Sequence, residues 1–350
     1  APQKITYFML FNTSSSEKVR DEKVRKALSG VIRTRDLVWQ TLGRFAQPAT
    51  GLIPPGILGH DPGRRPTTIT LEAARELLSS AGVDGKLQLK AAIHPLIRSR
   101  YHSLLDALYA SWEELGVEVV SEEGDMQTFL ELFIENEGID LWRTRWMLDF
   151  DDPDTFTHTL FHSVGGVHRT YFSTPEADEI LEGARAETQP SVRQLAYRRF
   201  EHLLLDSGSL IPLFHDVGYR LASPKIRGVR LSSVSPFVNY SELGKHETAA
   251  AVDSNAGGGV LQVPMSGLVS SLDPSAMPTY YDSELRGTLF ETLLRDVGGA
   301  RIEPWLAEEY RIEAGGRRYR FRLREGIRFH DGRNLTARDV RYSLERLLRH

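Results

Sequence analysis

The sequence predicts an α/β fold with a parallel sheet, in a chain long enough for two domains. The chain has 350 residues, which is comfortable for two domains and long for one. Between residues 87 and 148, apolar strand-like runs alternate with amphipathic helical runs through short links. Strand–helix–strand order of this kind favours right-handed crossovers and parallel strands.

The first 80 residues begin with a strand and continue with helices. Residues 5–11 form an apolar run typical of a buried strand. Apolar positions at helical spacing predict helices over 24–32 and near 35–42. The prolines and glycines of 49–57 predict an irregular segment, and Thr70 is placed to cap a helix over 71–80.

The central part carries the alternation that defines the fold class. The expected order is strand 87–93, helix 101–115, strand 117–120, helix 126–135 and strand 139–148. Two further helices are expected over 175–187 and 192–204. A strand follows at 210–214, where Pro212 favours a sheet edge or a bulge.

The composition changes after residue 243. Residues 244–259 are small, polar and rich in glycine, which predicts a linker between segments 1–243 and 260–350. A strand is expected at 260–265, then an exposed turn and a hairpin across Gly315 and Gly316. Thr336 and Asp339 have the spacing of a capping box that starts the last helix.

Composition and motifs exclude several functions. The net charge of −4 gives no bias toward nucleic acid or membrane surfaces, and no apolar run approaches the ~20 residues of a membrane span. The chain has no cysteine, so disulfides and thiolate chemistry are absent. We find no P-loop, dinucleotide fingerprint or nucleophile elbow, and therefore expect no enzyme and no cofactor.

Several segments resemble those of one family, the bacterial extracellular solute-binding proteins of family 5, which are the peptide-, dipeptide- and nickel-binding proteins of ATP-driven importers. The resemblance implies a periplasmic-binding-protein-like (type II) architecture with two lobes. The segments that carry it are 24–32, 49–62, 146–156, 171–178, 210–215, 304–310, 319–332 and 335–346.

The order of these segments differs from the family's order. The material of 260–350 comes first in the family, that of 1–243 comes last, and a middle section is not found here. A circular permutation and a tandem array both fit, and we favour permutation, since neighbouring termini are easily joined by a linker. Strands from 260–323 added to the lobe of Phe214 would support permutation, whereas a separate body would support tandem units.

The strand at 139–148 runs into four aspartates at positions 149, 151, 152 and 154. Ligands in open α/β sheets bind at the carboxyl edge of the strands. The segment 146–156 resembles the peptide-binders' motif, which implies that Asp149 pairs with a ligand ammonium group, while the other three aspartates support the loop. From residue type alone Asp149 is equally a capping residue.

Several neighbours of Asp149 have two interpretations each. Trp142 and Trp146 either wall the ligand site or belong to the core. Arg143 and Arg145 either bind a ligand carboxylate or neutralise the aspartates. The family resemblance adds Tyr280 and Tyr281 as contacts from the other lobe, against the alternative of exposed loop tyrosines.

Other polar residues are expected to be structural. His158, His162 and His168 do not have the spacing of a zinc motif and are interpreted as solvated loop histidines. His330 and Asp331 belong to a turn that is structural in the family, and Asn334 leads into the cap of the last helix.

The predicted function is therefore that of a periplasmic or membrane-anchored extracellular solute-binding protein of an ABC importer. It would bind peptide-like or other ammonium-bearing solutes between its lobes, deliver them to a membrane permease, act as a monomer, and bind no nucleic acid. The alternative is a cytoplasmic ligand-sensing module of a transcriptional or signalling regulator.

Overall fold

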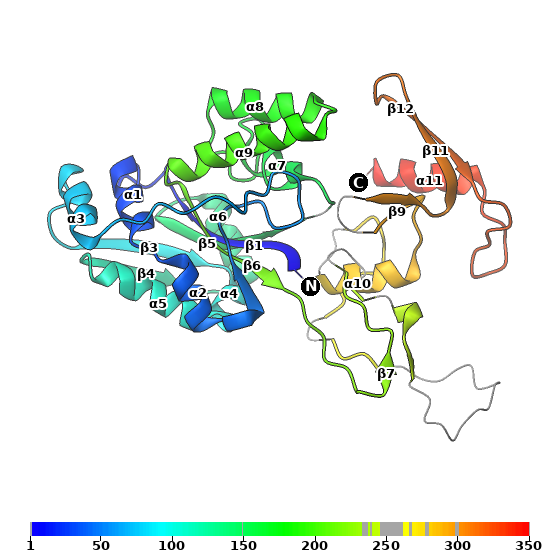
Figure 1. Cartoon of the computed structure of the whole chain (residues 1–350), viewed down its shortest axis with the longest axis horizontal. Helices are drawn as coiled ribbons and strands as arrows, with labels where there is room; N and C mark the ends of the chain where they lie inside the picture. The colour runs from blue at the N-terminus through cyan, green and yellow to red at the C-terminus, as the bar shows by residue number, and fades with distance from the viewer. Residues whose placement is uncertain are drawn as a thin grey trace. The chain divides into compact units, whose positions relative to one another are not determined.

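The structure is a computed structural model that describes residues 2–148, 150–232, 237–238, 240–245, 262–265, 268–276, 280–297 and 301–349. The chain divides into two compact units (Figure 1). The N-terminal unit comprises Pro2–Gly218, and the C-terminal unit comprises Tyr219–His350. The boundary falls before the predicted linker, so 219–243 group with the segment that follows.

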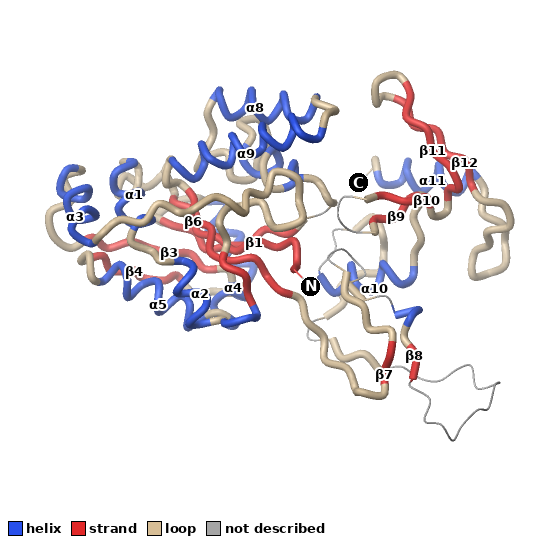
Figure 2. The backbone as a smooth tube through the Cα atoms, viewed as in Figure 1, coloured by secondary structure: helices blue, strands red, loops and turns tan. Residues whose placement is uncertain are grey.

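A mixed six-stranded sheet forms the centre of the N-terminal unit (Figure 2), with strand order β2-β6-β1-β5-β3-β4. Its strands are β1 (Pro2–Phe11), β2 (Ala46–Pro48), β3 (Leu87–Ile93), β4 (Val117–Glu122), β5 (Leu141–Met147) and β6 (Leu210–Val217). The parallel part predicted from the alternation is confirmed, because β3 pairs in parallel with both β4 and β5.

Helices cover both faces of this sheet, each over its own apolar core. The first core is covered by α1 (Glu22–Gly30), α2 (Thr34–Thr41), α3 (Leu71–Ser80), α4 (Pro95–Arg100) and α5 (His102–Glu113). The second is covered by α6 (Met126–Glu135), α7 (His158–Phe161), α8 (Pro175–Ala186) and α9 (Pro190–Asp206). Short 3₁₀ turns lie at Gly43–Phe45 and Pro153–Thr155.

Local side-chain contacts explain where these helices begin. Thr70 caps α3, as predicted, because its side chain accepts a hydrogen bond from the backbone N–H of Ala73. Within the first core the indole N–H of Trp112 donates to the carbonyl of Leu28 at 2.8 Å, which joins α5 to α1. Trp112 is fully buried, so this bond satisfies a donor that water cannot reach.

The pairing of β1 and β6 departs from a purely parallel sheet. β1 lies between β5 and β6 and runs antiparallel to both. β6 is an interior strand, and its pairing with β1 shifts register between the pairs Tyr7↔Phe214 and Phe8↔Pro212. Pro212 therefore sits at a bulge rather than at an edge, which is where a residue without an N–H is tolerated inside a sheet.

The C-terminal unit consists of small two-stranded sheets and two longer helices. Its elements are β7 (Ile226–Arg227), a 3₁₀ turn (Tyr240–Glu242), β8 (Gly244–Lys245), α10 (Tyr280–Leu289), β9 (Leu294–Asp296), β10 (Ile302–Pro304), β11 (Ala307–Glu313), β12 (Arg318–Leu323) and α11 (Ala337–Leu347). The predicted hairpin is β11–β12, and the capping box of Thr336 and Asp339 is present at the start of α11.

One prediction for this unit is wrong. Residues 262–265 are not in a strand, and positions 260 and 261 lie outside the described residues. The described strands of the unit form separate sheets and add none to the sheet that holds Phe214. The choice between a permutation and tandem units stays a prediction.

Candidate functional site

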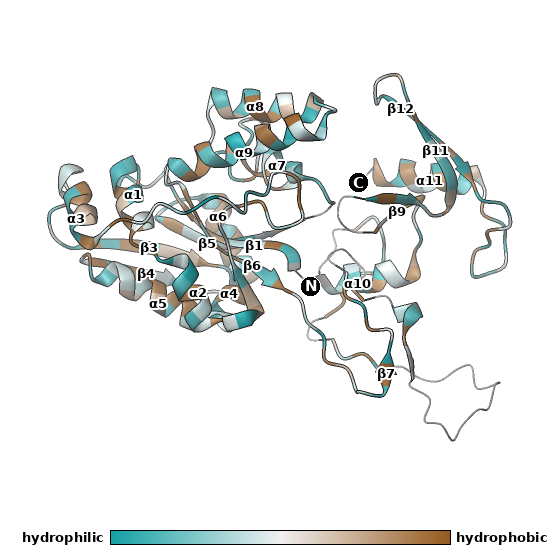
Figure 3. Ribbon diagram, in the orientation of Figure 1, coloured by the Kyte–Doolittle hydropathy of each residue, from teal (hydrophilic) through white to brown (hydrophobic). Residues whose placement is uncertain are grey.

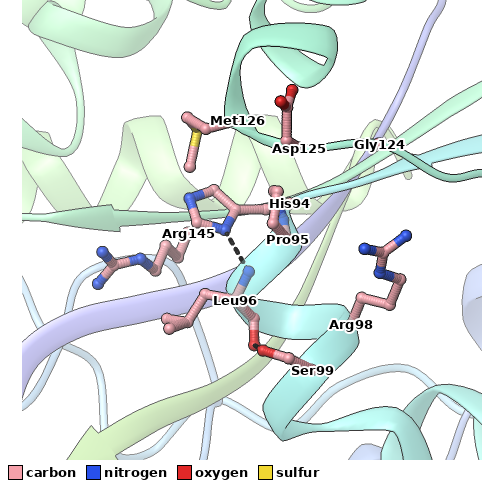
Figure 4. A pocket seen from close by; sticks show the side chains of 9 residues that line it. All are labelled: His94, Pro95, Leu96, Arg98, Ser99, Gly124, Asp125, Met126 and Arg145. Atoms are coloured by element: carbon pink, nitrogen blue, oxygen red, sulfur yellow. Dashed lines mark hydrogen bonds between the residues drawn. The ribbon is translucent and has the colours of Figure 1, made fainter. Parts of the chain in front are cut away.

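A pocket of about 600 Å³ opens in the N-terminal unit at the carboxyl edge of its parallel strands (Figure 4). It lies just beyond the ends of β3 and β4 and beside Arg145 of β5. This is the edge at which open α/β sheets bind ligands. The lining residues are His94, Pro95, Leu96, Arg98, Ser99, Gly124, Asp125, Met126 and Arg145.

Two helix starts shape the walls of this pocket. His94 follows β3 directly, and its Nδ1 accepts a hydrogen bond from the N–H of Leu96 at 3.2 Å, which caps α4 ahead of Pro95. Asp125 caps α6 by accepting from the N–H and the hydroxyl of Thr128 at 2.9 and 3.0 Å. These two caps fix the backbone of the pocket wall at the first turns of α4 and α6.

The electrostatics of the pocket are dominated by arginine. Burial, reinforced by the nearby charge of Arg145, lowers the pKa of His94 to about 4, so its imidazole is neutral at pH 7. Arg98 forms an ion pair with Glu123 at 3.2 Å. Arg145 forms no ion pair with any described carboxylate, although its charge opposes the burial that raises the pKa of Asp216.

Of the residues predicted to bind ligand, Arg145 lines this pocket, whereas Asp149 lies outside the described residues. Side chains alternate along β5, so Trp142 and Trp146 face the second core, opposite to Arg145. Trp146 is half-buried at the margin of that core.

Trp142 is a core residue, which corrects the expectation that it contacts ligand. Its side chain is fully buried, and the rings of Phe129 and Phe133 meet it edge-on at 5.7 and 5.3 Å between centroids. A side chain enclosed in this way has no surface to offer a solute.

Arg143 does not neutralise the aspartate run. Its guanidinium is fully buried beneath α5 and lies over the ring of Tyr109, 3.8 Å from the centroid. None of its nitrogens has a hydrogen-bond partner among the described residues, and burial lowers its pKa well below the usual value. The cation–π contact with the Tyr109 ring is the favourable interaction that offsets part of the cost of burying this charge.

Other cations balance the three aspartates that follow position 149. Lys4 pairs with Asp151, and Arg193 pairs with Asp152 at 3.0 Å. Asp154 is 3.3 Å from the guanidinium of Arg185. All three aspartates therefore support the loop, as the sequence predicted.

The two tyrosines predicted from the other lobe belong to the C-terminal unit. Tyr280 and Tyr281 are the first residues of α10 rather than part of an exposed loop. The side chain of Tyr280 lies outside what the structure describes, and that of Tyr281 is half-buried. Their contact with a ligand remains a prediction.

The expectation of solvated loop histidines is wrong. His158 is the first residue of α7, is half-buried, and stacks on the ring of His162. His162 ends α7, is buried, and hydrogen-bonds Glu182 at 3.1 Å. His168 is buried among the rings of Phe8, Phe133, Trp146, Phe161 and Tyr171. No group of three metal-ligating side chains is found among the described residues.

Most of the residues that line the pocket are not among those predicted from the sequence to bind ligand. His94, Leu96 and Arg98 follow a strand that was predicted correctly, so the rule that placed a site after β5 applies equally after β3. Met126 and Asp125 begin the next crossover helix and occupy the corresponding position after β4.

An α/β lobe with a pocket at its sheet edge is an architecture that binds small molecules, and comparison with known proteins places the chain in one family of solute-binding proteins. The sequence profile of the bacterial extracellular solute-binding proteins, family 5 (Middle), matches residues 1–167 and 301–350. The chain belongs to this family.

Curated relatives and solved structures agree with this assignment. The chain is 28% identical to the periplasmic murein peptide-binding protein MppA of Escherichia coli over 239 residues, which are 66% of this chain and 44% of MppA. The structure of E. coli MppA superposes with a TM-score of 0.57 and 26% identity, covering 65% of this chain and 45% of MppA.

A third match shows the fold alone. A dipeptide-binding protein from Pseudoalteromonas sp. SM9913, solved with Met-Leu, gives a TM-score of 0.59 at 20% identity over 70% of this chain and 49% of that one. The fold is thus that of periplasmic binding proteins. The chain spans less than half the length of the curated relatives it matches most strongly. Within the described residues, no helix is both long and apolar enough to cross a membrane.

Proposed function

We propose that this chain is part of an extracytoplasmic solute-binding protein of an ABC importer and that it binds peptide-like or other ammonium-bearing solutes without chemical turnover. Family membership supports solute binding. Names of relatives support the solute class, since they include a murein peptide-binding protein and oligopeptide-binding proteins. One solved neighbour is described as an ABC transporter-associated periplasmic binding protein in complex with a peptide.

The observation that carries the proposal is the position of the pocket. It opens at the carboxyl edge of β3, β4 and β5, where the family motif also puts Asp149. Its volume of about 600 Å³ is within the usual range for small-molecule sites, roughly 300–1,000 Å³. We propose that the bound solute is delivered to a membrane permease by a monomeric protein.

Asp149 is the proposed partner of the ligand's ammonium group, with Trp146 beside it and Tyr280 and Tyr281 as further contacts. A carboxylate that is partly removed from water gains most from a charge-assisted hydrogen bond to a cation. Three cations already pair with Asp151, Asp152 and Asp154, so the loop around position 149 keeps its support when that one carboxylate is changed.

The test is titration calorimetry of the whole chain with di- and tripeptides. Asp149→Asn is expected to weaken binding of peptides with a free N-terminus by roughly 10- to 100-fold, since a hydrogen bond to a charged group contributes about 1.5–3 kcal/mol. N-acetylated peptides should bind the wild type as weakly as the free peptides bind the variant.

Asp206→Asn is the matched control. Asp206 carries an exposed carboxylate in the same unit, where it pairs with Arg64, and its loss should leave peptide affinity unchanged. Equal affinity of wild type and Asp149→Asn for free peptides would remove Asp149 from the site, and no binding by the wild type would contradict the proposed function.

A further inference from the structure

We propose that Lys4 is a positioning residue for Asp149. Its buried ion pair with Asp151 would fix the loop that follows β5 and so set the preference of the site for solutes with a free ammonium group. The role of Asp149 rests on the proposed function, whereas the hold of Lys4 on the loop can be measured without any ligand.

Lys4 holds the chain on both sides of position 149. Its carbonyl accepts the backbone N–H of Leu148 at 3.1 Å, and its ammonium group pairs with the carboxylate of Asp151. Leu148 directly precedes position 149, and Asp151 follows two residues after it. A segment of two residues between two fixed points can adopt few conformations. One residue of β1 thus limits how the chain can pass through position 149.

The direction of the Lys4 side chain follows from its place in β1. Side chains alternate along a strand, and the next residue, Ile5, belongs to the first core. Lys4 therefore lies on the opposite face, together with Phe8 and Leu10 of the second core. The loop after β5 leads to α7, which covers that same core. The ammonium group of Lys4 consequently meets the loop from the sheet.

Burial makes this ion pair a strong constraint. The side chains of Lys4 and Asp151 are each 5% exposed. A charge that is removed from water is costly unless a partner compensates for it, so each of the two groups holds the other in place. An exposed pair would impose little, because water competes for both charges. If Asp151 loses Lys4, its carboxylate should move toward water and carry the loop with it.

The pair also affects which carboxylate a ligand can use. Arginines of α8 and α9 occupy the two later aspartates of the loop, as Arg185 with Asp154 and Arg193 with Asp152. Lys4 occupies the third, so a ligand's ammonium group would have to displace a cation to bind any of them. Without Lys4, Asp151 would become a competing acceptor two residues away from Asp149.

A second lysine–aspartate pair of the same unit provides a matched control. Lys18 pairs with Asp140 at 3.0 Å, and the side chain of Asp140 is 7% exposed. Asp140 directly precedes β5, whereas Asp151 follows it. The two pairs join residues that are 122 and 147 positions apart in the sequence. Lys18→Met therefore removes a comparable contact at the opposite end of the same strand.

Hydrogen exchange of the whole chain without ligand tests the hold on the loop. Lys4→Met should speed exchange at the amides of Leu148 and Asp152, which donate to the carbonyls of Lys4 and Phe150, by roughly 10- to 100-fold. Lys4→Arg keeps the charge and should retain most of the protection. Lys18→Met should leave both amides unchanged. Should Lys4→Met fail to fold, Asp151→Asn removes the same pair from the loop side.

Titration calorimetry tests the effect on the site, with L-alanyl-L-alanine and its N-acetylated form as probes. Lys4→Met should reduce the preference for the free peptide roughly 10-fold, while Lys4→Arg and Lys18→Met should preserve it. In an Asp149→Asn background, Lys4→Met should cause little further loss, because both changes act through one carboxylate. A purely structural role would lower affinity equally in both backgrounds.

The outcomes separate the role of Lys4 from the proposed function. Unchanged exchange at Leu148 and Asp152 in Lys4→Met would overturn the positioning role, and so would a preference for the free peptide that survives this substitution. Equal losses in Lys4→Met and Lys18→Met would overturn it too, since they would reflect general stability. Absence of peptide binding by the wild type would contradict the proposed function, while faster exchange confined to Lys4→Met would still support the hold on the loop.

Discussion

The two units of this chain differ sharply in how they are held together. The N-terminal unit buries apolar side chains on both faces of one sheet. In the C-terminal unit the buried apolar side chains among the described residues are Phe237, Val238 and Ala307. Burial of apolar surface is the main favourable term in folding, and the described part of the C-terminal unit gains much less from it than the N-terminal unit does.

In the C-terminal unit, two carboxylates of α10 hold neighbouring segments of the chain through hydrogen bonds. Glu284 is buried and accepts hydrogen bonds from the N–H of Phe237 and the hydroxyl of Tyr240 at 2.8 and 2.7 Å. Asp282 is fully buried and accepts from the N–H groups of Ser270 and Ser271. The bonds of Glu284 connect segments on either side of the predicted linker, whereas those of Asp282 lie within the segment that follows it.

The last helix of this unit has an apolar face that is not buried among the described residues. α11 alternates polar and apolar residues at helical spacing (Figure 3), yet none of its described side chains is buried. Leu344 and Leu347 are about half exposed, and a groove of about 300 Å³ runs between this helix and the side chains of Phe321 and Leu323. An amphipathic helix gains its stability mainly by packing its apolar face, and here that gain is small.

The largest expected effect concerns independent folding. Residues 2–218 produced alone should unfold in a single cooperative transition in urea, with a free energy of unfolding of about 5–15 kcal/mol. Residues 219–350 produced alone should show no cooperative transition by circular dichroism. A cooperative transition in the second fragment would contradict the comparison between the two units.

The same substitution in each unit sharpens the comparison. Leu108 is fully buried in the first core, whereas Leu348, just past the end of α11, is 88% exposed. Leu108→Ala should lower the free energy of unfolding by about 2–5 kcal/mol. Leu348→Ala should change it by less than about 0.5 kcal/mol. Chemical denaturation of the two variants measures both values, and similar losses would show that α11 is packed in solution.

Acid should destabilise the N-terminal unit through two buried histidines. Burial lowers the pKa of both His168 and His215 to about 3, below the unfolded value of 6.5. Below pH 6.5 the unfolded chain therefore binds protons that the folded chain does not, and stability falls as the pH decreases toward 3. The loss should be on the order of 2–3 kcal/mol for each histidine at pH 4.

Glu201 acts in the opposite direction, because burial raises its pKa to about 7 and its contribution is lost as the pH rises from 4.5 to 7. His168→Phe should flatten the acid limb of a plot of stability against pH. An unchanged acid limb in His168→Phe would remove that histidine from the explanation.

The smallest expected effect is local to the C-terminal unit. Glu284→Ala should increase hydrogen exchange at the amide of Phe237, which loses its acceptor, and reduce local stability by about 1–3 kcal/mol. Glu284→Gln keeps an acceptor oxygen and should have a smaller effect. Exchange in residues 2–218 should be unaltered in both variants, and protection of Phe237 that survives Glu284→Ala would show that another contact holds this segment.

Elements of the fold that depend on local chemistry could be predicted from the sequence. Thr70 and Asp339 indicate where helices begin, because their side chains accept hydrogen bonds from backbone N–H groups three residues away. The insertion of β1 between β5 and β6 could not be predicted, since an apolar run of strand length does not specify its partners. The bulge at Pro212 follows from that pairing.

Some features of the candidate site could likewise be predicted from the sequence, and others could not. Because ligands bind at the carboxyl edge of parallel strands, the strand pattern is enough to predict that Arg145 lies at a site. The burial of Trp142 could not be predicted, because it depends on Phe129 and Phe133 of the preceding helix. The enclosure of His168 needs rings that are more than 100 residues apart in the chain, such as Phe8 and Phe133. Residue type alone does not contain that information.

The central position of β1 has a consequence for synthesis on the ribosome. Leu10 of β1 lies opposite Leu210 of β6, and both edges of β1 are filled only after that distant strand has been made. At roughly 5–20 residues per second, the nascent chain would expose this apolar strand for about 10–40 s. During that interval the segment is a target for aggregation and for chaperones, so the rate of translation bears directly on the yield of folded protein.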